Sequence, residues 1–148
     1  MSMFCYQCQE TAKNTGCTVK GVCGKNEEVA KLQDLLIYTL KGISDIVVKG
    51  KVDVHNLDKT NYEVLSSLFM TITNANFDDG HIEAQISKMI KLRDELKNSV
   101  NLNDFHDASI FTVDSRETMI EKATSVGVLS TENEDIRSLR EMIIYGLK

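Results

Sequence analysis

The chain has 148 residues, of which 42% are hydrophobic and 26% are charged, and its formal net charge is −5. This composition is typical of one globular domain and argues against wholesale disorder. No apolar run is long enough for a membrane span, the N-terminus has no apolar signal-peptide core, and the dispersed basic residues do not favour nucleic acid. We therefore expect a cytoplasmic protein that binds neither membranes nor nucleic acid. The complete absence of proline favours helix.

Residues 1–25 form a segment rich in cysteine and glycine, which we expect to be loop with short helical turns. A helix is predicted over residues 27–49, with Asn26 as its N-cap and Gly50 as its end. Apolar residues recur along it every three or four positions, which predicts a buried face. That face comprises Val29, Leu32, Leu36, Leu40, Ile43 and Val47, and is widened by Leu35, Ile37 and Ile46.

Two further helices are predicted in the middle of the chain, over about residues 60–74 and 79–99. Asp58 or Thr60 is expected to cap the first of these. Its inward residues are expected to be Leu65, Leu68, Phe69 and Ile72. The inward residues of the next helix are expected to be Ile82, Ile86, Met89, Ile90 and Leu96. Its charged residues are expected to face mostly solvent, namely Lys88, Lys91, Arg93, Glu95 and Lys97.

The last third of the chain is predicted to hold a short helix and a longer one. Residues 100–113 are expected to be irregular, and Asp114 is expected to cap a short helix that Gly127 ends. Residues 126–129 are expected to be a short extended piece. The final helix is expected to open within residues 131–134 and to run to the end of the chain.

The final helix repeats part of the first one in sequence. LQDLLIYTLK at residues 32–41 matches LREMIIYGLK at residues 139–148, with Leu, Ile, Tyr, Leu and Lys at equivalent positions. The match predicts two helical bundles related by duplication, each opened by the same type of helix. Because the second copy stops at Lys148 where the first continues, we expect a truncated chain. The alternative is a natural C-terminal helix whose last lysine complements the helix dipole.

The four cysteines all lie near the N-terminus, at Cys5, Cys8, Cys17 and Cys23. A disulfide framework normally spreads its cysteines through a small secreted fold, so this crowding in a chain without an export signal favours a metal site. Four thiolates suit either tetrahedral zinc or an iron–sulfur cluster. Common zinc sites use two closely spaced cysteine pairs, whereas five residues separate the second pair here. The spacing therefore favours iron–sulfur over zinc, and thiols without a metal are the third possibility.

The charge of the same segment agrees with a bound anionic cluster. The segment contains one acidic residue, Glu10, and three lysines, Lys13, Lys20 and Lys25. A four-iron cluster with four thiolates is anionic, so nearby lysines would offset its charge. The alternative is that these lysines only form the solvated face of a loop.

The cysteine motif also carries a family resemblance. MFCYQCQETA at residues 3–12 and GVCGK at residues 21–25 resemble the start of the hybrid cluster protein (prismane) family of hydroxylamine reductases. The resemblance continues through LQDLLIY at residues 32–38 and TITNANF at residues 71–77. It reappears in TENED at residues 131–135, so it covers essentially the whole chain.

The resemblance implies a cofactor, an activity and a division of labour. It implies that Cys5, Cys8, Cys17 and Cys23 hold a cubane [4Fe–4S] cluster that carries electrons. In the family a second cluster, a hybrid of iron, sulfur and oxygen, reduces hydroxylamine to ammonia or reduces related nitrogen oxides. Its ligands lie beyond this chain, so no catalytic residue is assigned here. The implied partners are a redox electron donor and the remainder of the parent chain.

The other polar residues predict no second site. His55, His81 and His106 lie in different segments and are interpreted as surface or capping residues. The run of residues 132–134 is interpreted as a helix start. We therefore predict a mainly α-helical fold, with a cluster-binding cysteine-rich segment at residues 1–25.

Residues 26–148 are expected to form a helical bundle region within the same domain, ending in the first helix of a second bundle. The functional prediction is the N-terminal electron-transfer part of a hydroxylamine reductase. Two alternatives remain, a zinc-stapled helical interaction module without a redox role and a helical scaffold whose cysteines are structural thiols.

Overall fold

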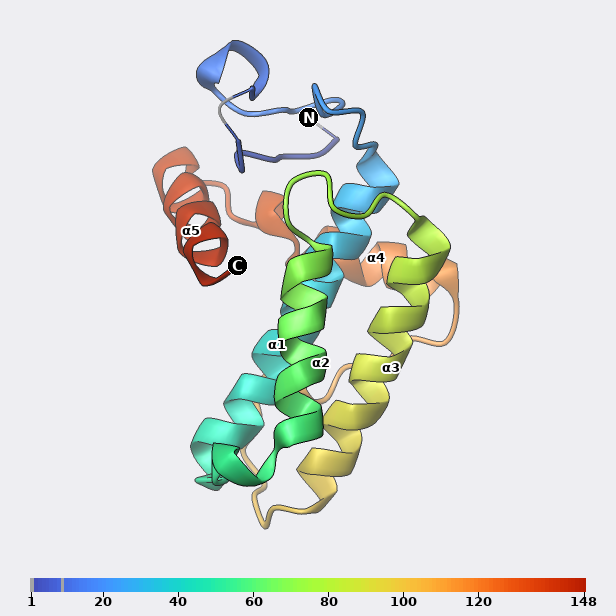
Figure 1. Ribbon diagram of the computed structural model, residues 1–148, viewed down its shortest axis with the longest axis vertical. Coiled ribbons are helices and arrows are strands. Elements are labelled where there is room, and N and C mark those ends of the chain that lie inside the picture. The colour runs from blue at the N-terminus through green and yellow to red at the C-terminus, as the bar shows by residue number, and fades with distance from the viewer. Residues whose placement is uncertain (1, 9) are drawn as a thin grey trace.

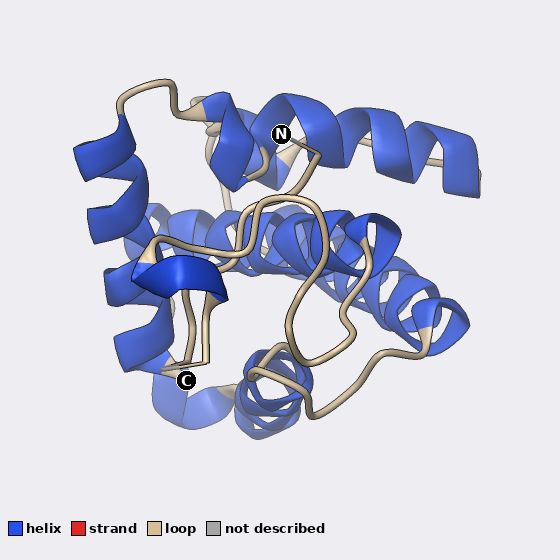
Figure 2. Ribbon diagram, turned by 90° about the horizontal axis from the view of Figure 1, so that it is seen from above, coloured by secondary structure: helices blue, strands red, loops and turns tan. Residues whose placement is uncertain are grey.

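The computed structural model describes residues 2–8 and 10–148, and this part of the chain is mainly helical, as predicted. Its α-helices are α1 (Glu27–Gly50), α2 (Asp58–Met70), α3 (Asp79–Asn98), α4 (Arg116–Val126) and α5 (Glu134–Leu147). The described residues contain no β-strand, only a single bridge between Cys5 and Cys17 (Figure 2). In this part of the chain, no helix combines the length and the apolar character needed to cross a bilayer.

Helix α1 is the central element of the fold. Asn26 caps it by accepting a hydrogen bond from the Val29 backbone N–H at 2.8 Å, as expected. Its apolar face is buried against α3 and α4, while α2 runs alongside (Figure 1). Burial of apolar side chains on facing helices is the main stabilising term of such a core. The cysteine-rich segment lies at the end of the bundle where α1 begins (Figure 1).

Helix α2 begins and ends earlier than predicted, and two of its four predicted inward residues are exposed, whereas Leu68 packs against the core as predicted. Leu65 and Phe69 are 66% and 67% exposed, so their predicted burial is wrong. The buried side chains include Glu63 and Ser67, which both accept hydrogen bonds from Gln85 of α3. These polar contacts satisfy the buried groups, while Leu65 and Phe69 lie in solvent.

Arg93 on α3 was predicted to face solvent, and this prediction is wrong, because its side chain is 0% exposed. Its guanidinium donates to the backbone carbonyls of Ala108 and Phe111, at 3.1 and 2.7 Å, and pairs with Asp94 at 2.9 Å. A buried charge is tolerated only when it is paired in this way. Arg93 thereby fixes the irregular segment after α3 against the bundle.

The connections around α4 differ from the prediction in detail. Ser115, rather than Asp114, is the N-cap, and it forms a capping box with Thr118. Gly127 follows the helix, as predicted. Residues Val128–Ser130 then form a 3₁₀ turn instead of the expected extended piece. The turn is held by the Val128 backbone N–H, which donates to the Asp34 carboxylate of α1 at 2.9 Å.

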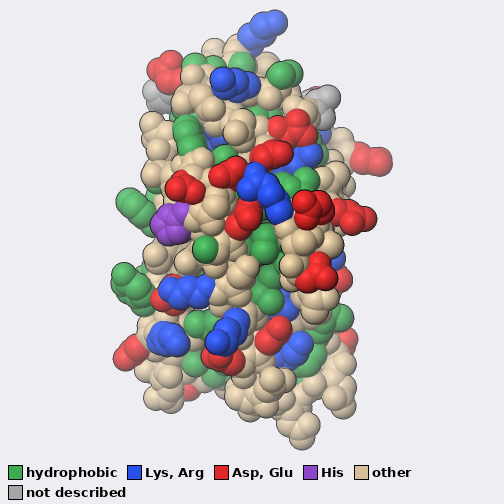
Figure 3. Space-filling view, turned by 90° about the vertical axis from the view of Figure 1, so that its right-hand side faces the viewer, with side chains coloured by type: hydrophobic (Ala, Val, Ile, Leu, Met, Phe, Trp, Pro, Cys, Tyr) green, Lys and Arg blue, Asp and Glu red, His purple; other side chains and the backbone are tan. Residues whose placement is uncertain are grey.

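Arg116 at the start of α4 links three helices on the surface. Its guanidinium contacts Glu28 of α1 at 2.7 Å and Asp79 of α3 at 2.6 Å, and it also pairs with Glu83. Figure 3 shows one face of the molecule on which basic side chains lie among acidic ones in this manner. Each exposed pair of this kind contributes little stability alone, but the shared arginine orients α4.

The two copies of the repeated sequence line opposite sides of one pocket. Helix α5 lies beside the first half of α1, and a small pocket of about 40 Å³ separates them. Four equivalent positions of each copy line this pocket, namely Gln33 and Arg140, Asp34 and Glu141, Ile37 and Ile144, and Lys41 and Lys148. Equivalent positions of the two copies therefore face the same pocket.

Candidate metal centre

All four cysteines line one pocket, of about 340 Å³, at the N-terminal end of the bundle. Cys17 is buried and Cys5 is half-buried, whereas Cys8 and Cys23 are exposed at its rim. The remaining lining includes Thr73 and Asn74 from the loop after α2. The structure thus brings the four residues that the sequence singled out together around one pocket, two of them exposed.

Short-range backbone contacts hold the cysteines around this pocket. Cys5 and Cys17 are paired through their backbones, with N–H to O distances of 3.1 and 2.9 Å. Gly16, before Cys17, has φ = +112°, and a Cβ there would lie 2.6 Å from the Phe4 ring. A Cβ on Gly21 would lie 3.1 Å from the Cys23 sulfur. Glycine at these two positions lets the chain reverse and approach closely.

The loop after α2 closes one side of the pocket. The Thr73 backbone N–H donates to Gln7 Oε1 at 3.1 Å, which joins this loop to the segment between Cys5 and Cys8. Gln33 of α1 donates to the Asn76 carbonyl at 3.1 Å and holds the other end of the loop. Sequence reasoning assigned no site role to Gln7 or Thr73. The sequence signal for a role of this loop was the TITNANF run at residues 71–77, which carries part of the family resemblance.

A buried lysine lies against the cysteines. Lys25 is 2% exposed, and its Nζ lies 3.9 Å from Cys5 Sγ and 2.7 Å from Gln33 Oε1. Lys13 and Lys20 are exposed, so only Lys25 of the three lysines is enclosed beside the pocket. From the sequence, the lysines could either offset the charge of a cluster or form the solvated face of a loop. The structure places Lys25 inside the protein beside the pocket, and Lys13 and Lys20 on the solvated face.

The two inner thiols have different electrostatic surroundings. Burial raises the pKa of Cys5, and Lys25 opposes that effect. For Cys17 burial also acts to raise the pKa, but hydrogen bonds from the backbone N–H groups of Ala12 and Val22, together with Thr11 and Lys25, lower the pKa overall. The Thr11 hydroxyl, 3.7 Å from Cys17 Sγ, acts in the same direction. Hydrogen bonds to a cysteine sulfur favour the thiolate, which is the form that binds metals.

The four thiols surround the pocket without converging on one point. Within residues 2–8 and 10–148, no three His, Cys, Asp or Glu side chains converge closely enough to hold one metal ion. Tetrahedral zinc would draw four sulfurs to about 2.3 Å from one centre. An iron–sulfur cluster would also take four thiolate ligands, and the cation and N–H donors beside Cys5 and Cys17 fit an anionic group.

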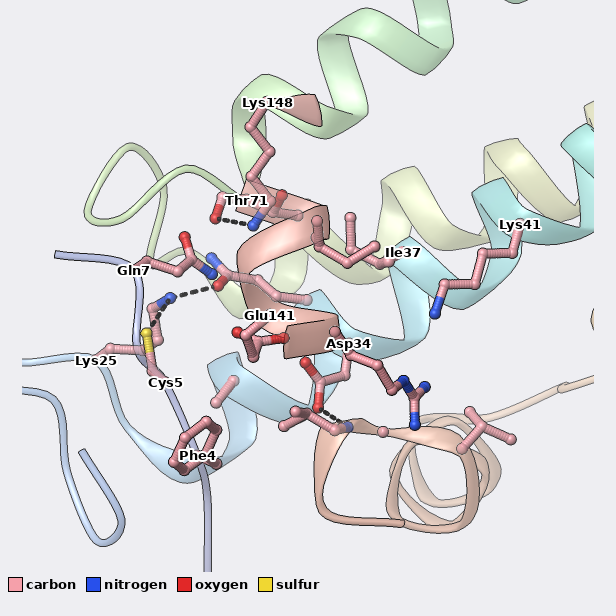
Figure 4. Close-up of a pocket in the computed structure, with 17 residues that line it drawn as sticks. Phe4, Cys5, Gln7, Lys25, Asp34, Ile37, Lys41, Thr71, Glu141 and Lys148 are labelled. Carbon is pink, nitrogen blue, oxygen red and sulfur yellow. Dashed lines mark hydrogen bonds between the residues drawn. The ribbon is translucent and has the colours of Figure 1, made fainter. Parts of the chain in front are cut away.

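A second, polar pocket adjoins the first, and Cys5, Gln7 and Lys25 line both (Figure 4). It is the pocket between α1 and α5. Burial, and secondarily Glu141, raise the pKa of Asp34 to about 7. Burial lowers the pKa of Lys148 to about 8, against the opposing effect of Glu141. This pocket therefore gathers charged groups within the protein beside the candidate metal centre.

The remaining polar residues lie where the sequence placed them. The three histidines are exposed, and His106 caps the 3₁₀ turn at Asp107–Ser109 through its Nδ1. Asn133 caps α5 by accepting from the Ile136 N–H at 3.0 Å, so the run at 132–134 is a helix start.

Comparison with known proteins gives a consistent result over the whole chain. Residues 3–148 match the profile of the Prismane/CO dehydrogenase family. A hydroxylamine reductase of Acetivibrio thermocellus is 73% identical over 148 residues, which are 100% of this chain and 27% of that protein. Hydroxylamine reductases of Nitratidesulfovibrio vulgaris and Clostridium perfringens are 54% and 52% identical, covering 99% and 100% of this chain and 28% of each relative. The chain thus spans about a quarter of the length of these relatives, and it belongs to the Prismane/CO dehydrogenase family.

Proposed function

We propose that this chain binds one [4Fe–4S] cluster through Cys5, Cys8, Cys17 and Cys23, and that it forms the N-terminal electron-transfer part of a hydroxylamine reductase. The observation that carries the proposal is the meeting of four thiols around a single pocket of about 340 Å³. The names of the relatives support the activity of the longer protein. The cluster, when bound, supplies one-electron redox chemistry, and the protein supplies ligation, orientation and electrostatics.

The residues of the chain have distinct parts in this proposal. The buried Cys17 and half-buried Cys5 anchor the inner side of the site, and backbone N–H groups stabilise the Cys17 thiolate. Gln7 and Thr73, which are hydrogen-bonded to one another, close the wall of the pocket and limit access of water. The exposed Cys8 and Cys23 lie on the side from which a redox partner would deliver electrons.

Reduction of hydroxylamine to ammonia and water consumes two electrons and two protons. A carrier that transfers one electron at a time must be used twice for each molecule of substrate. We place the reducing centre, the hybrid cluster of the resembled family, in the remainder of the longer protein. This remainder would also cover the exposed apolar side chains of α2 and α5, such as Leu65, Phe69 and Met142.

A redox measurement on the reconstituted chain tests this proposal. The chain is reconstituted without air with iron and sulfide, desalted, and followed by visible absorption during reduction with dithionite and reoxidation. We expect a brown protein with a broad visible band that bleaches on reduction and returns on oxidation. A colourless protein that retains zinc would contradict the proposal and support the helical interaction module. A colourless protein without any metal would support the thiol scaffold.

A further inference from the structure

Lys25 is held in an unusual position for a lysine. Lysine side chains are almost never fully buried unless they are paired, yet Lys25 is 2% exposed. Its Nζ is 2.7 Å from the amide oxygen of Gln33 and 3.9 Å from the Cys5 sulfur. Figure 4 shows Lys25 beside Cys5, and Lys25 lines both the polar pocket and the pocket of the four cysteines.

The charge of Lys25 is not cancelled by a direct carboxylate partner. Among the described residues, none of the salt bridges within 4.0 Å involves Lys25. Its closest partner is a neutral amide, and that amide is itself fixed because Gln33 Nε2 donates to the Asn76 carbonyl at 3.1 Å. Asp34, Glu141 and Lys148 line the adjoining pocket and contribute weaker, longer-range fields. The amine of Lys25 therefore lies 3.9 Å from the Cys5 sulfur without a carboxylate beside it among the described residues.

We propose that Lys25 sets the reduction potential of the cluster bound at the four cysteines, raising it through the charge that Gln33 positions beside Cys5. This inference rests on the proposed function. Reduction adds one negative charge to the cluster, so a fixed cation nearby stabilises the reduced state more than the oxidised state. The interaction is strong because it acts inside the protein, where screening by water is weak.

The test compares the midpoint potentials of charge variants in the reconstituted chain, measured by an anaerobic redox titration that is followed by electron paramagnetic resonance. Lys25→Met removes the charge and keeps an unbranched apolar stem, whereas Lys25→Arg keeps the charge. Lys20→Met is the matched control, because Lys20 lies in the same segment and is exposed.

We expect the equilibrium constant for reduction to fall at least tenfold in Lys25→Met, which is about 59 mV for a one-electron couple. Lys20→Met should retain the wild-type potential, and Lys25→Arg should lie closer to wild type than Lys25→Met does. A Lys25→Met protein with wild-type iron content and an unchanged potential would overturn the inference.

Gln33→Glu is a second variant for the case that Lys25→Met does not retain iron. It places a carboxylate 2.7 Å from the ammonium and cancels its charge while Lys25 remains in place. A lower potential in Gln33→Glu supports the inference, and an unchanged potential overturns it. Loss of iron from both variants would overturn it as well, because Lys25 would then serve cluster assembly. Wild-type chain that binds no iron and sulfide would instead contradict the proposed function.

Discussion

Asp34 of α1 and Glu141 of α5 occupy the same position in the two copies of the repeated sequence, and their carboxylates face one small pocket (Figure 4). Burial raises the pKa of both groups, and Glu141 adds to the effect on Asp34. Lysines at equivalent positions, Lys41 and Lys148, line the same pocket. The pocket between the two repeats thus holds acidic and basic groups, and we expect the stability of the fold to depend on pH.

Asp34→Asn should flatten the dependence of stability on pH. The pKa of Asp34 is about 7 in the folded chain and near 4 when unfolded, so between these values only the folded state retains the proton. The folded state is therefore favoured at the acid end, and its stability falls as pH rises, by at most about 1.4 kcal/mol per pH unit.

Urea unfolding of the metal-free chain at several pH values between about 5 and 7 measures this effect. Asparagine keeps an oxygen that can accept from the Val128 N–H, so the variant should fold. As pH rises across this range, we expect the free energy of unfolding of the wild type to fall relative to that of Asp34→Asn. Parallel pH profiles for the two proteins would contradict the assignment of a raised pKa to Asp34.

Gly42→Ala should destabilise the bundle. A Cβ on Gly42 would overlap the Ala108 carbonyl oxygen, and the Ser109 hydroxyl hydrogen-bonds to the Gly42 carbonyl at 3.0 Å. Overpacking against fixed backbone costs about 1–3 kcal/mol, which exceeds the gain in helix propensity of roughly 0.5–1 kcal/mol. Gly146→Ala in α5 is the control, because nothing lies within 4 Å of its added Cβ and it should be at least as stable as wild type. Equal stabilities for the two variants in urea unfolding would rule out the close contact.

Cys8→Ala should remove most of the bound iron without weakening the metal-free fold. Cys8 is exposed at the pocket rim, so its loss leaves no cavity, but a four-ligand site without a spare thiol then lacks one ligand. Val19→Ala is the control, since Val19 is exposed in the same segment and should keep wild-type iron content. Iron analysis after anaerobic reconstitution measures both variants. Full iron and sulfide in Cys8→Ala would show that Cys8 is not a ligand.

The 148-residue chain should not reduce hydroxylamine at an enzymatic rate. Its four cysteines are all committed to the proposed electron-transfer cluster, and its histidines are dispersed on the surface. Ammonia production from hydroxylamine with a reduced viologen measures the activity, with a full-length relative as the positive control. Sustained turnover by the chain, abolished by one cysteine substitution, would mean that the cysteine-bound cluster itself is the catalyst.

Sequence periodicity predicted most of α1 and α3 because their apolar faces are regular and are buried against one another. It placed Leu65 and Phe69 of α2 inward wrongly, although Leu68 does pack against the core. The buried polar residues Glu63 and Ser67 find partners on α3, which no pattern within α2 reveals. The burial of Arg93 has the same origin, since its partners are carbonyls beyond the end of α3.

The cysteines of the candidate site were evident from their number and spacing, because their crowding was itself the signal. The wall formed by Thr73 and the role of Gln7 depend on a contact across 66 residues, which local patterns do not specify. Lys25 was one of three lysines in the segment, and only the packing of the Gln33 side chain distinguishes it from the others.

The iron and acid-labile sulfide content of the anaerobically reconstituted, desalted chain tests the central claim most directly, when zinc is measured in the same sample. The account predicts iron and sulfide in equal amounts, at one [4Fe–4S] cluster per chain, with zinc absent. One zinc per chain with neither iron nor sulfide would contradict it.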